Sequence, residues 1–253
     1  MNFITDHPLV LFVAFMVVLF AAERAGMKLS RWHRGDEKGV GEAFGVLQGA
    51  TLTLLALIIG FSFSMSIGRY DQRKNFEEAE ANAIGTEYLR LGLLAPAQTA
   101  HARTLLRDYL QQRILFYEIT DSERLRQVTD RKNQLQTSLW AVVEAPAHEQ
   151  TGTIMALVVA GMNDVINSEG YTQAAWWNRI PTAAWVLMTI VAVGCNFLLG
   201  FGSQQLTVEP ALLLVLPLVV SISFMLIADI DSPHGGVIRV SSQNLRALQS
   251  SLH

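Results

Sequence analysis

Cysteine is almost absent from this chain, which has 253 residues and a single cysteine, Cys195. One thiol excludes an internal disulfide and a cysteine-based zinc site. Charge is also scarce, because 16% of the residues are charged, whereas about 25% is usual in a soluble domain. A net charge of -3 leaves no basic surplus for binding a polyanion. The composition therefore argues against a soluble enzyme and against a nucleic-acid-binding protein.

The charges are missing in four blocks. No Asp, Glu, Lys or Arg occurs in the 16 residues after Asp6, the 26 after Glu42, the 29 after Arg179 and the 19 after Glu209. A helix needs roughly 20 residues to cross a bilayer, so we expect an all-α integral membrane protein with four transmembrane helices. No basic residue precedes the first block, which favours a retained helix over a cleaved signal peptide. The expected crossings are Pro8–Ala22, Ala43–Gly68, Ile180–Phe201 and Leu206–Ala228, with a tight turn at 202–205.

These crossings divide the chain into four parts: a first transmembrane pair at 1–68, an insert at 69–178, a second transmembrane pair at 179–228 and a tail at 229–253. Apolar residues of the insert recur every three or four positions, which predicts helices, four in number. We expect breaks at Pro96, at 120–122 and at Pro146, with Asp121 or Ser122 capping the helix that follows.

The second crossing carries more polar side chains than a simple anchor needs: Gln48, Thr51, Thr53, Ser62, Ser64 and Ser66. Its glycines at Gly41, Gly45 and Gly49 are spaced by four, which forms a ridge that another helix can approach closely. Such a ridge predicts helix packing along this face.

Steps of four through the same crossing place Thr53, Leu57 and Phe61 on one stripe. In a ring of subunits this stripe would line a narrow, mostly apolar pore. In the alternative interpretation, the residues of this crossing pack inside the helix bundle of one subunit, and its hydroxyls bond back to carbonyls one turn earlier.

Several motifs in order along the chain carry a family resemblance. A Gly60-Phe61 pair ends the run from Leu57 and is followed, after seven residues, by Arg69-Tyr70. Further matches are the acidic helix at 77–90, prolines in the last hairpin and the stretch 228–241. Together they resemble the bestrophin channel family, and more closely its bacterial bestrophin-like membrane proteins.

The resemblance implies a homo-oligomeric ring, a pentamer in bestrophins, that conducts inorganic ions through a bacterial inner membrane. Both chain ends and the helical insert would be cytoplasmic. Thr53, Leu57 and Phe61 would face the hydrophobic neck of the pore, while Gly60 and Arg69 would shape the pore helix. The expected partners are therefore membrane lipid, further copies of the chain and ions, with no cofactor and no nucleic acid.

Two departures from the family pattern stand in the sequence. Bestrophins typically have an apolar residue followed by proline at the first neck position, where this chain has Thr53 and Leu54. Calcium-gated members carry a run of acids after the last span, whereas only Asp229 and Asp231 precede Pro233 here. These two acids are candidates for an ion or subunit contact, although a capped turn is the commoner use of such residues.

A second group of candidate ligands, two acids and an amide, follows the second crossing at Glu77, Glu80 and Asn82. These residues are further candidates for a cation or subunit contact. Alternatively, the glutamates pair with Arg73 and Lys74 on the same helix.

The main alternative to a channel is a non-conducting scaffold or sensor whose charged insert, with charge-rich runs at 69–74 and 121–126, binds a partner. Those runs also fit solvated helix faces. We expect no enzyme, because the chain lacks Gly-x-Ser-x-Gly and His-Glu-x-x-His motifs and its histidines are scattered.

Overall fold

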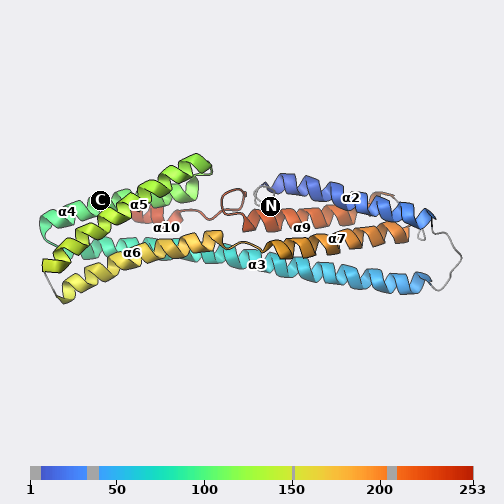
Figure 1. The fold of residues 1–253 in the computed structure, drawn as a ribbon, viewed down its shortest axis with the longest axis horizontal. Coiled ribbons are helices and arrows are strands. Elements are labelled where there is room, and N and C mark those ends of the chain that lie inside the picture. Colours follow the sequence, from blue (N-terminus) through green and yellow to red (C-terminus); the bar gives the residue numbers. More distant parts are fainter. Residues whose placement is uncertain (1–6, 33–39, 150–151, 204–209, 253) are drawn as a thin grey trace. The chain divides into compact units, whose positions relative to one another are not determined.

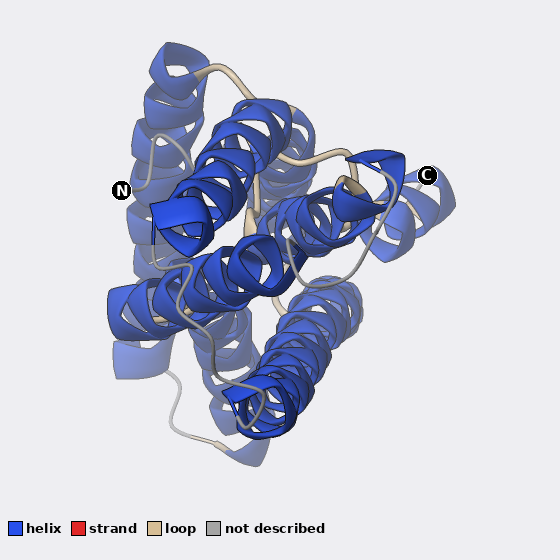
Figure 2. Ribbon diagram, turned by 90° about the vertical axis from the view of Figure 1, so that its right-hand side faces the viewer, coloured by secondary structure: helices blue, strands red, loops and turns tan. Residues whose placement is uncertain are grey.

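The computed structural model describes residues 7–32, 40–149, 152–203 and 210–252. Within these ranges the chain is helical and has no β-strand (Figures 1 and 2), which confirms the all-α prediction. The helices are α2 (Pro8–Trp32), α3 (Val40–Arg90), η1 (Leu91–Leu93), α4 (Pro96–Glu118), α5 (Ser122–Glu149), α6 (Thr153–Trp177), α7 (Thr182–Ser203), α8 (Pro210–Leu213), α9 (Val215–Asp231) and α10 (Gln243–Ser251).

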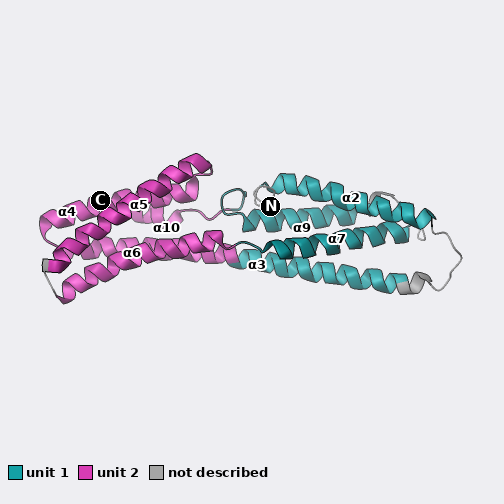
Figure 3. Ribbon diagram, in the orientation of Figure 1, with its two compact units in different colours: residues 1–68, 179–238 teal, residues 69–178, 239–253 magenta. Residues whose placement is uncertain are grey.

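The chain forms two compact units (Figure 3). Unit 1 comprises residues 1–68 and 179–238, and unit 2 comprises residues 69–178 and 239–253. The tail is therefore shared, because it contributes to unit 1 as far as residue 238 and to unit 2 after it. Helix α3 is continuous through the boundary at residue 68.

Unit 1 packs α2 against both α7 and α9. Phe224 on α9 lies between two aromatic rings, with centroid distances of 4.7 Å to Phe15 on α2 and 6.2 Å to Trp185 on α7, both edge to face. Leu19 and Met188 are fully buried in the same core. Since Phe15 and Trp185 meet the same ring, the early turns of α2 and α7 lie at the same level.

Two glycines let α2 and α7 approach backbone to backbone. A Cβ on Gly26 would collide with the carbonyl of Phe197, and one on Gly200 would collide with the carbonyl of Glu23. Small residues at such crossings are typical of transmembrane helix pairs. The pair Gly26 and Gly200 was not predicted, because the regular glycine spacing in the sequence lies on α3.

Three helical stretches in the described residues are long and apolar enough to cross a membrane: Pro8–Trp32, Phe44–Leu93 and Thr153–Ser203. The last stretch contains α7. The expected fourth crossing corresponds to α8 and α9, of which α9 has only 17 residues, fewer than the roughly 20 that a crossing needs. The expected turn at 202–205 lies mostly outside the described residues.

The first expected crossing ends too early at Ala22. Helix α2 continues to Trp32, and Glu23, Gly26 and Met27 on this added part are buried. Their burial explains the extension, because these residues contact α7 in place of water.

The expected breaks of the insert are correct at two of three places. Pro96 starts α4 at a position where its missing N–H costs nothing. The backbone N–H of Arg124 donates to Oδ1 of Asp121 at 2.8 Å, so Asp121 caps α5. The break at Pro146 is wrong, because α5 continues to Glu149. Proline removes one helical hydrogen bond. Because Pro146 lies in the last turn of α5, little of the helix beyond it depends on that bond.

Unit 2 buries one side of α3 against α4 and α6. Leu91 and Ile84, seven residues apart, are fully buried in an apolar core with Leu106, Leu110, Val158 and Met162. Positions seven apart lie on one face of a helix. The neighbouring row at Arg73, Glu80 and Glu87 has the same spacing and is also buried.

Candidate functional site

The part of α3 within unit 1 buries a narrow face. Its buried residues are Leu55, Ser62 and Ser66. Large apolar side chains on the rest of its surface are exposed: Val46, Leu47, Leu54, Leu57, Phe61, Phe63, Met65 and Ile67. Only 11% of the most apolar stretch of this helix is buried by its own chain, against 22% for α2. An apolar surface of this extent indicates contact with lipid or with another protein chain.

All three residues of the expected stripe lie on this exposed surface. Thr53 is exposed, and the exposed fractions of Leu57 and Phe61 are 53% and 68%. Packing inside one subunit's bundle therefore does not describe these three residues, although it does describe Ser62 and Ser66. The stripe bears no charge.

The hydroxyls of this segment donate to their own helix, as one of the two interpretations expected. Thr51 donates to the carbonyl of Leu47 at 2.9 Å, Thr53 to that of Gly49 at 2.9 Å, and Ser66 to that of Ser62 at 3.0 Å. Thr53 therefore has its donor satisfied and presents little polar character to its surroundings.

Three glycines in the unit 1 part of α3 have open space beside them. A Cβ on Gly45, Gly49 or Gly60 would meet no atom of another element within 4 Å in the described part of the chain, and Gly41 lies in the first turn of the helix. Arg69 is half-buried at the start of unit 2. A role for these residues in subunit packing stays a prediction.

The acidic residues after the crossing have separate surroundings. Glu77 is buried and accepts hydrogen bonds from the backbone N–H of Leu245 at 3.0 Å and from Nδ2 of Asn244 at 2.6 Å. Its carboxylate thus lies at the N-terminus of α10, where the helix dipole favours negative charge. Asn82 is exposed. In the part of the chain that the structure describes, no three His, Cys, Asp or Glu residues are grouped so as to hold a metal ion.

Asp229 and Asp231 organise the end of α9 through backbone hydrogen bonds. Asp229 accepts from the N–H groups of Val237 at 2.7 Å and Ile238 at 2.9 Å. Asp231 accepts from the N–H of Ile180, just before α7, at 3.0 Å. This arrangement corresponds to the capped turn considered above, and any ion or further subunit contact of these acids stays a prediction.

Glu80 belongs to a buried ionic network in unit 2 that sequence analysis did not foresee. It forms a salt bridge with Arg113 and accepts a hydrogen bond from Thr172 at 3.2 Å. Arg113 also lies 3.8 Å from Glu169, whose carboxylate is 3.1 Å from Nζ of Lys132. Two acids and two bases therefore balance one another inside the helical bundle.

The surroundings of Arg113 favour its charged form. Burial lowers the pKa of Arg113, but Glu80 and the neighbouring tyrosines raise it by more, so the pKa lies above its ordinary value. Burial, reinforced by Glu80, raises the pKa of Tyr109 and of Tyr117. The guanidinium thus stays charged and both phenols stay neutral. The network serves structure, because every member is enclosed by α3, α4, α5 and α6.

Comparison with known protein families shows to which family the chain belongs. The family model of the bestrophin-like domain matches residues 10–245. The chain belongs to the bestrophin-like family. Known members of this family are ion channels, and the resemblance read from the sequence is thereby confirmed.

The fold of this bestrophin-like chain is that of solved bacterial homologues. It matches a crystal structure of a bacterial bestrophin homologue from Klebsiella pneumoniae with a TM-score of 0.64 and 15% identity, over 96% of each chain. A point variant of the Klebsiella homologue matches with a TM-score of 0.63 and 13% identity, over 97% of each chain. Identities this low establish the fold alone. Among curated proteins, no sequence matches this bestrophin-like chain.

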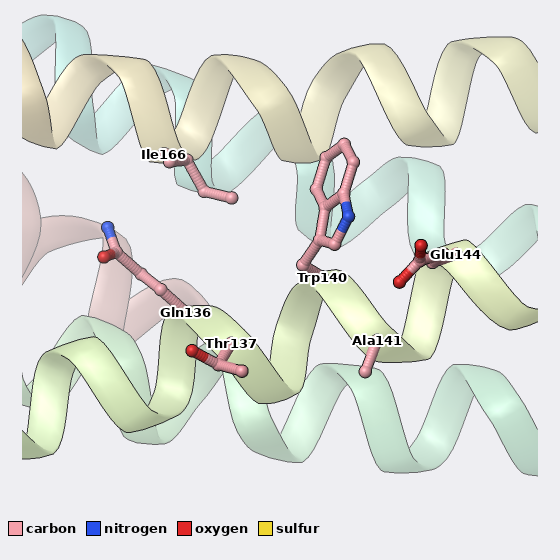
Figure 4. Close-up of a pocket in the computed structure, with 6 residues that line it drawn as sticks. All are labelled: Gln136, Thr137, Trp140, Ala141, Glu144 and Ile166. Carbon is pink, nitrogen blue, oxygen red and sulfur yellow. The ribbon is translucent and has the colours of Figure 1, made fainter.

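The insert of the bestrophin-like chain also has a shallow hollow, between α5 and α6 (Figure 4). Gln136 and Trp140 point from α5 towards α6, and Ile166 points back from α6. Thr137, Ala141 and Glu144 complete the lining. The hollow combines an indole ring with a carboxylate and is open to its surroundings.

Proposed function

We propose that this bestrophin-like protein is an ion channel whose pore is lined by α3. The observation that carries the proposal is the uncharged stripe Thr53, Leu57 and Phe61, which faces away from its own protomer. Helices of several copies that turn this stripe towards a common axis would enclose a hydrophobic neck. A constriction of this kind gates by losing and regaining water.

The assembly that we propose is a homo-oligomeric ring, most simply the pentamer of bestrophins, in a bacterial inner membrane. Four crossings would place both chain ends and the insert on one side of the membrane, and the family resemblance makes that side the cytoplasm. The fourth crossing would use α8 and α9 together, which run from Pro210 to Asp231 with one interruption at Leu214. Unit 1 favours burial in an apolar medium, because α2, α3, α7 and α9 all carry exposed large apolar residues.

Planar-bilayer recording of the purified protein tests the neck. Phe61→Ala should widen and wet the constriction, and we expect a several-fold higher current. Phe63→Ala is the matched control, because Phe63 is also exposed and lies on the same helix, about 200° around its axis from Phe61. Equal effects of the two substitutions, or silence of the wild type and of Phe61→Ala, would contradict the proposal.

A non-conducting scaffold or sensor is the second candidate, and the hollow beside Trp140 and Glu144 favours it. In that case the insert would bind a partner, and unit 1 would only anchor and assemble. A dimer, or a ring whose axis is filled with lipid, would support this candidate over the channel.

A further inference from the structure

Glu87 on α3 is a buried acid. The residue is 0% exposed, and neither carboxylate oxygen has a hydrogen-bond partner within the described ranges. An ionised carboxylate in such a place loses its hydration without compensation, which is among the most expensive arrangements in a protein. A protonated carboxyl avoids most of that loss.

Glu80, one heptad earlier on the same helix, is the informative contrast. It is equally buried, but Arg113 and Thr172 contact its carboxylate. The two glutamates thus share a helix face and a degree of burial and differ in their partners. The carboxyl group of Glu80 is paired with a guanidinium and a hydroxyl, whereas no described residue donates a hydrogen bond to that of Glu87.

The neighbour of Glu87 across the helix contact is Gly161 on α6. A Cβ at Gly161 would collide with Oε2 of Glu87 and would lie 2.6 Å from Nη1 of Arg90. The absence of a side chain at Gly161 therefore provides the space that the carboxyl occupies. The fit is close, so a hydrated or displaced carboxylate does not fit the same contact.

Two charged groups act on Glu87, one from α3 and one from α6. Arg90 on α3 attracts a negative charge, but its Nη1 is directed to the carbonyl of Leu157 at 3.5 Å. Asp164 on α6 repels a negative charge. On α4, Arg103 and Arg107 bind the carbonyl and the hydroxyl of Tyr88.

Burial raises the pKa of Glu87 most, Arg90 lowers it and Asp164 raises it, with a result of about 8. The carboxyl therefore changes its charge just above neutral pH, where an ordinary glutamate is fully ionised.

We propose that Glu87 is a proton-binding site built into the contact between α3 and α6, and that loss of this proton loosens the contact. Once ionised, the carboxylate gains water only by leaving the space at Gly161. This proposal does not depend on conduction, since it concerns packing inside unit 2.

The test is thermal unfolding of the full-length protein in detergent between pH 5 and 9.5, for the wild type, Glu87→Gln and Glu78→Gln. A folded-state pKa raised from 4.5 to about 8 means that the folded chain holds a proton that the unfolded chain releases. The stability that Glu87 contributes is therefore complete below pH 4.5 and is lost as pH rises through about 8.

We expect the unfolding midpoint of the wild type to fall by several degrees relative to Glu87→Gln between pH 5 and 8, and to run parallel to it above that range. Glu78→Gln should follow the wild type, because Glu78 is exposed on the same helix. Amide exchange at 157–164 of α6, corrected for its intrinsic pH dependence, should accelerate above pH 8 in the wild type and not in Glu87→Gln. Identical pH profiles of the wild type and Glu87→Gln in both measurements would overturn the proposal.

If the protein conducts, as proposed above, the same titration predicts a change in open probability near pH 8 that Glu87→Gln removes. This readout rests on the proposed function, whereas unfolding and amide exchange do not. A silent protein with the expected unfolding profiles would therefore refute the channel and leave the proton site supported.

Discussion

The two parts of helix α3 differ in which kind of side chain they bury and which they expose. Residues 43–68 contain no charge and expose large apolar side chains, of which Phe61 is the clearest. Residues 69–90 bury charged side chains, including Arg73, Glu80 and Glu87. An exposed apolar face is stable only where another apolar surface or lipid covers it. A buried charge is stable only where a partner or a proton neutralises it. One continuous helix therefore meets two different environments.

The largest expected change in stability follows from removing a charge partner in unit 2. Arg113→Ala would leave Glu80 and Glu169 facing each other without their shared cation. Removal of one member of a buried pair costs about 3–5 kcal/mol, so we expect the insert to unfold at a much lower temperature or to fail to fold.

Arg126→Ala provides the control for that substitution. Arg126 pairs with Glu123 on the surface, and both side chains are more than 60% exposed, at 70% and 63%. Exposed pairs contribute about 0–1 kcal/mol, so the unfolding midpoint should hardly change. A comparable fall of the unfolding midpoint in both variants would show that the buried network stabilises unit 2 no more than an exposed ion pair does.

The next effect concerns the close contact in unit 1. Gly200→Ala forces a methyl group onto the carbonyl of Glu23, and overpacking of this kind costs about 1–3 kcal/mol. Gly194→Ala on the same helix places its methyl group where, among the described residues, no atom of another element lies within 4 Å. Thermal unfolding in detergent should separate the two variants, and equal midpoints would refute the backbone contact between α2 and α7.

The smallest effect is expected at the end of the chain. Glu77→Gln weakens the acceptor that receives the N–H of Leu245, and the hydrogen bond to a charged group is worth about 1.5–3 kcal/mol when lost entirely. Amide exchange in α10 should rise several-fold while the global midpoint changes by little. Unchanged exchange in α10 would show that Glu77 does not hold this helix.

Much of the fold follows from the sequence because charge density reports the environment of each segment. Gaps between charges located three helical stretches that are long and apolar enough to cross a membrane. Of the two caps expected for α5, Asp121 or Ser122, Asp121 accepts the hydrogen bond. The extension of α2 past Glu23 was missed, because a buried acid resembles an interfacial one in sequence. The break predicted at Pro146 was wrong, because a proline in the last turn of a helix disturbs little of the helix that follows it.

The candidate site was less predictable. The stripe of Thr53, Leu57 and Phe61 follows from spacing, but its exposure depends on which face meets the rest of the protomer. The network around Arg113 was missed because charges on helices usually face solvent. A signal was nevertheless present, as Arg73, Glu80 and Glu87 repeat every seven residues beside Glu77, Ile84 and Leu91. Charges that share the period of an apolar row are candidates for burial.

An image of the assembled protein in a lipid bilayer would show directly whether α3 lines a pore. We expect a ring with rotational symmetry, most simply fivefold, in which Phe61 of every subunit points to the central axis and Phe63 does not. An assembly in which Phe61 contacts acyl chains, or a protomer without partners, would contradict it.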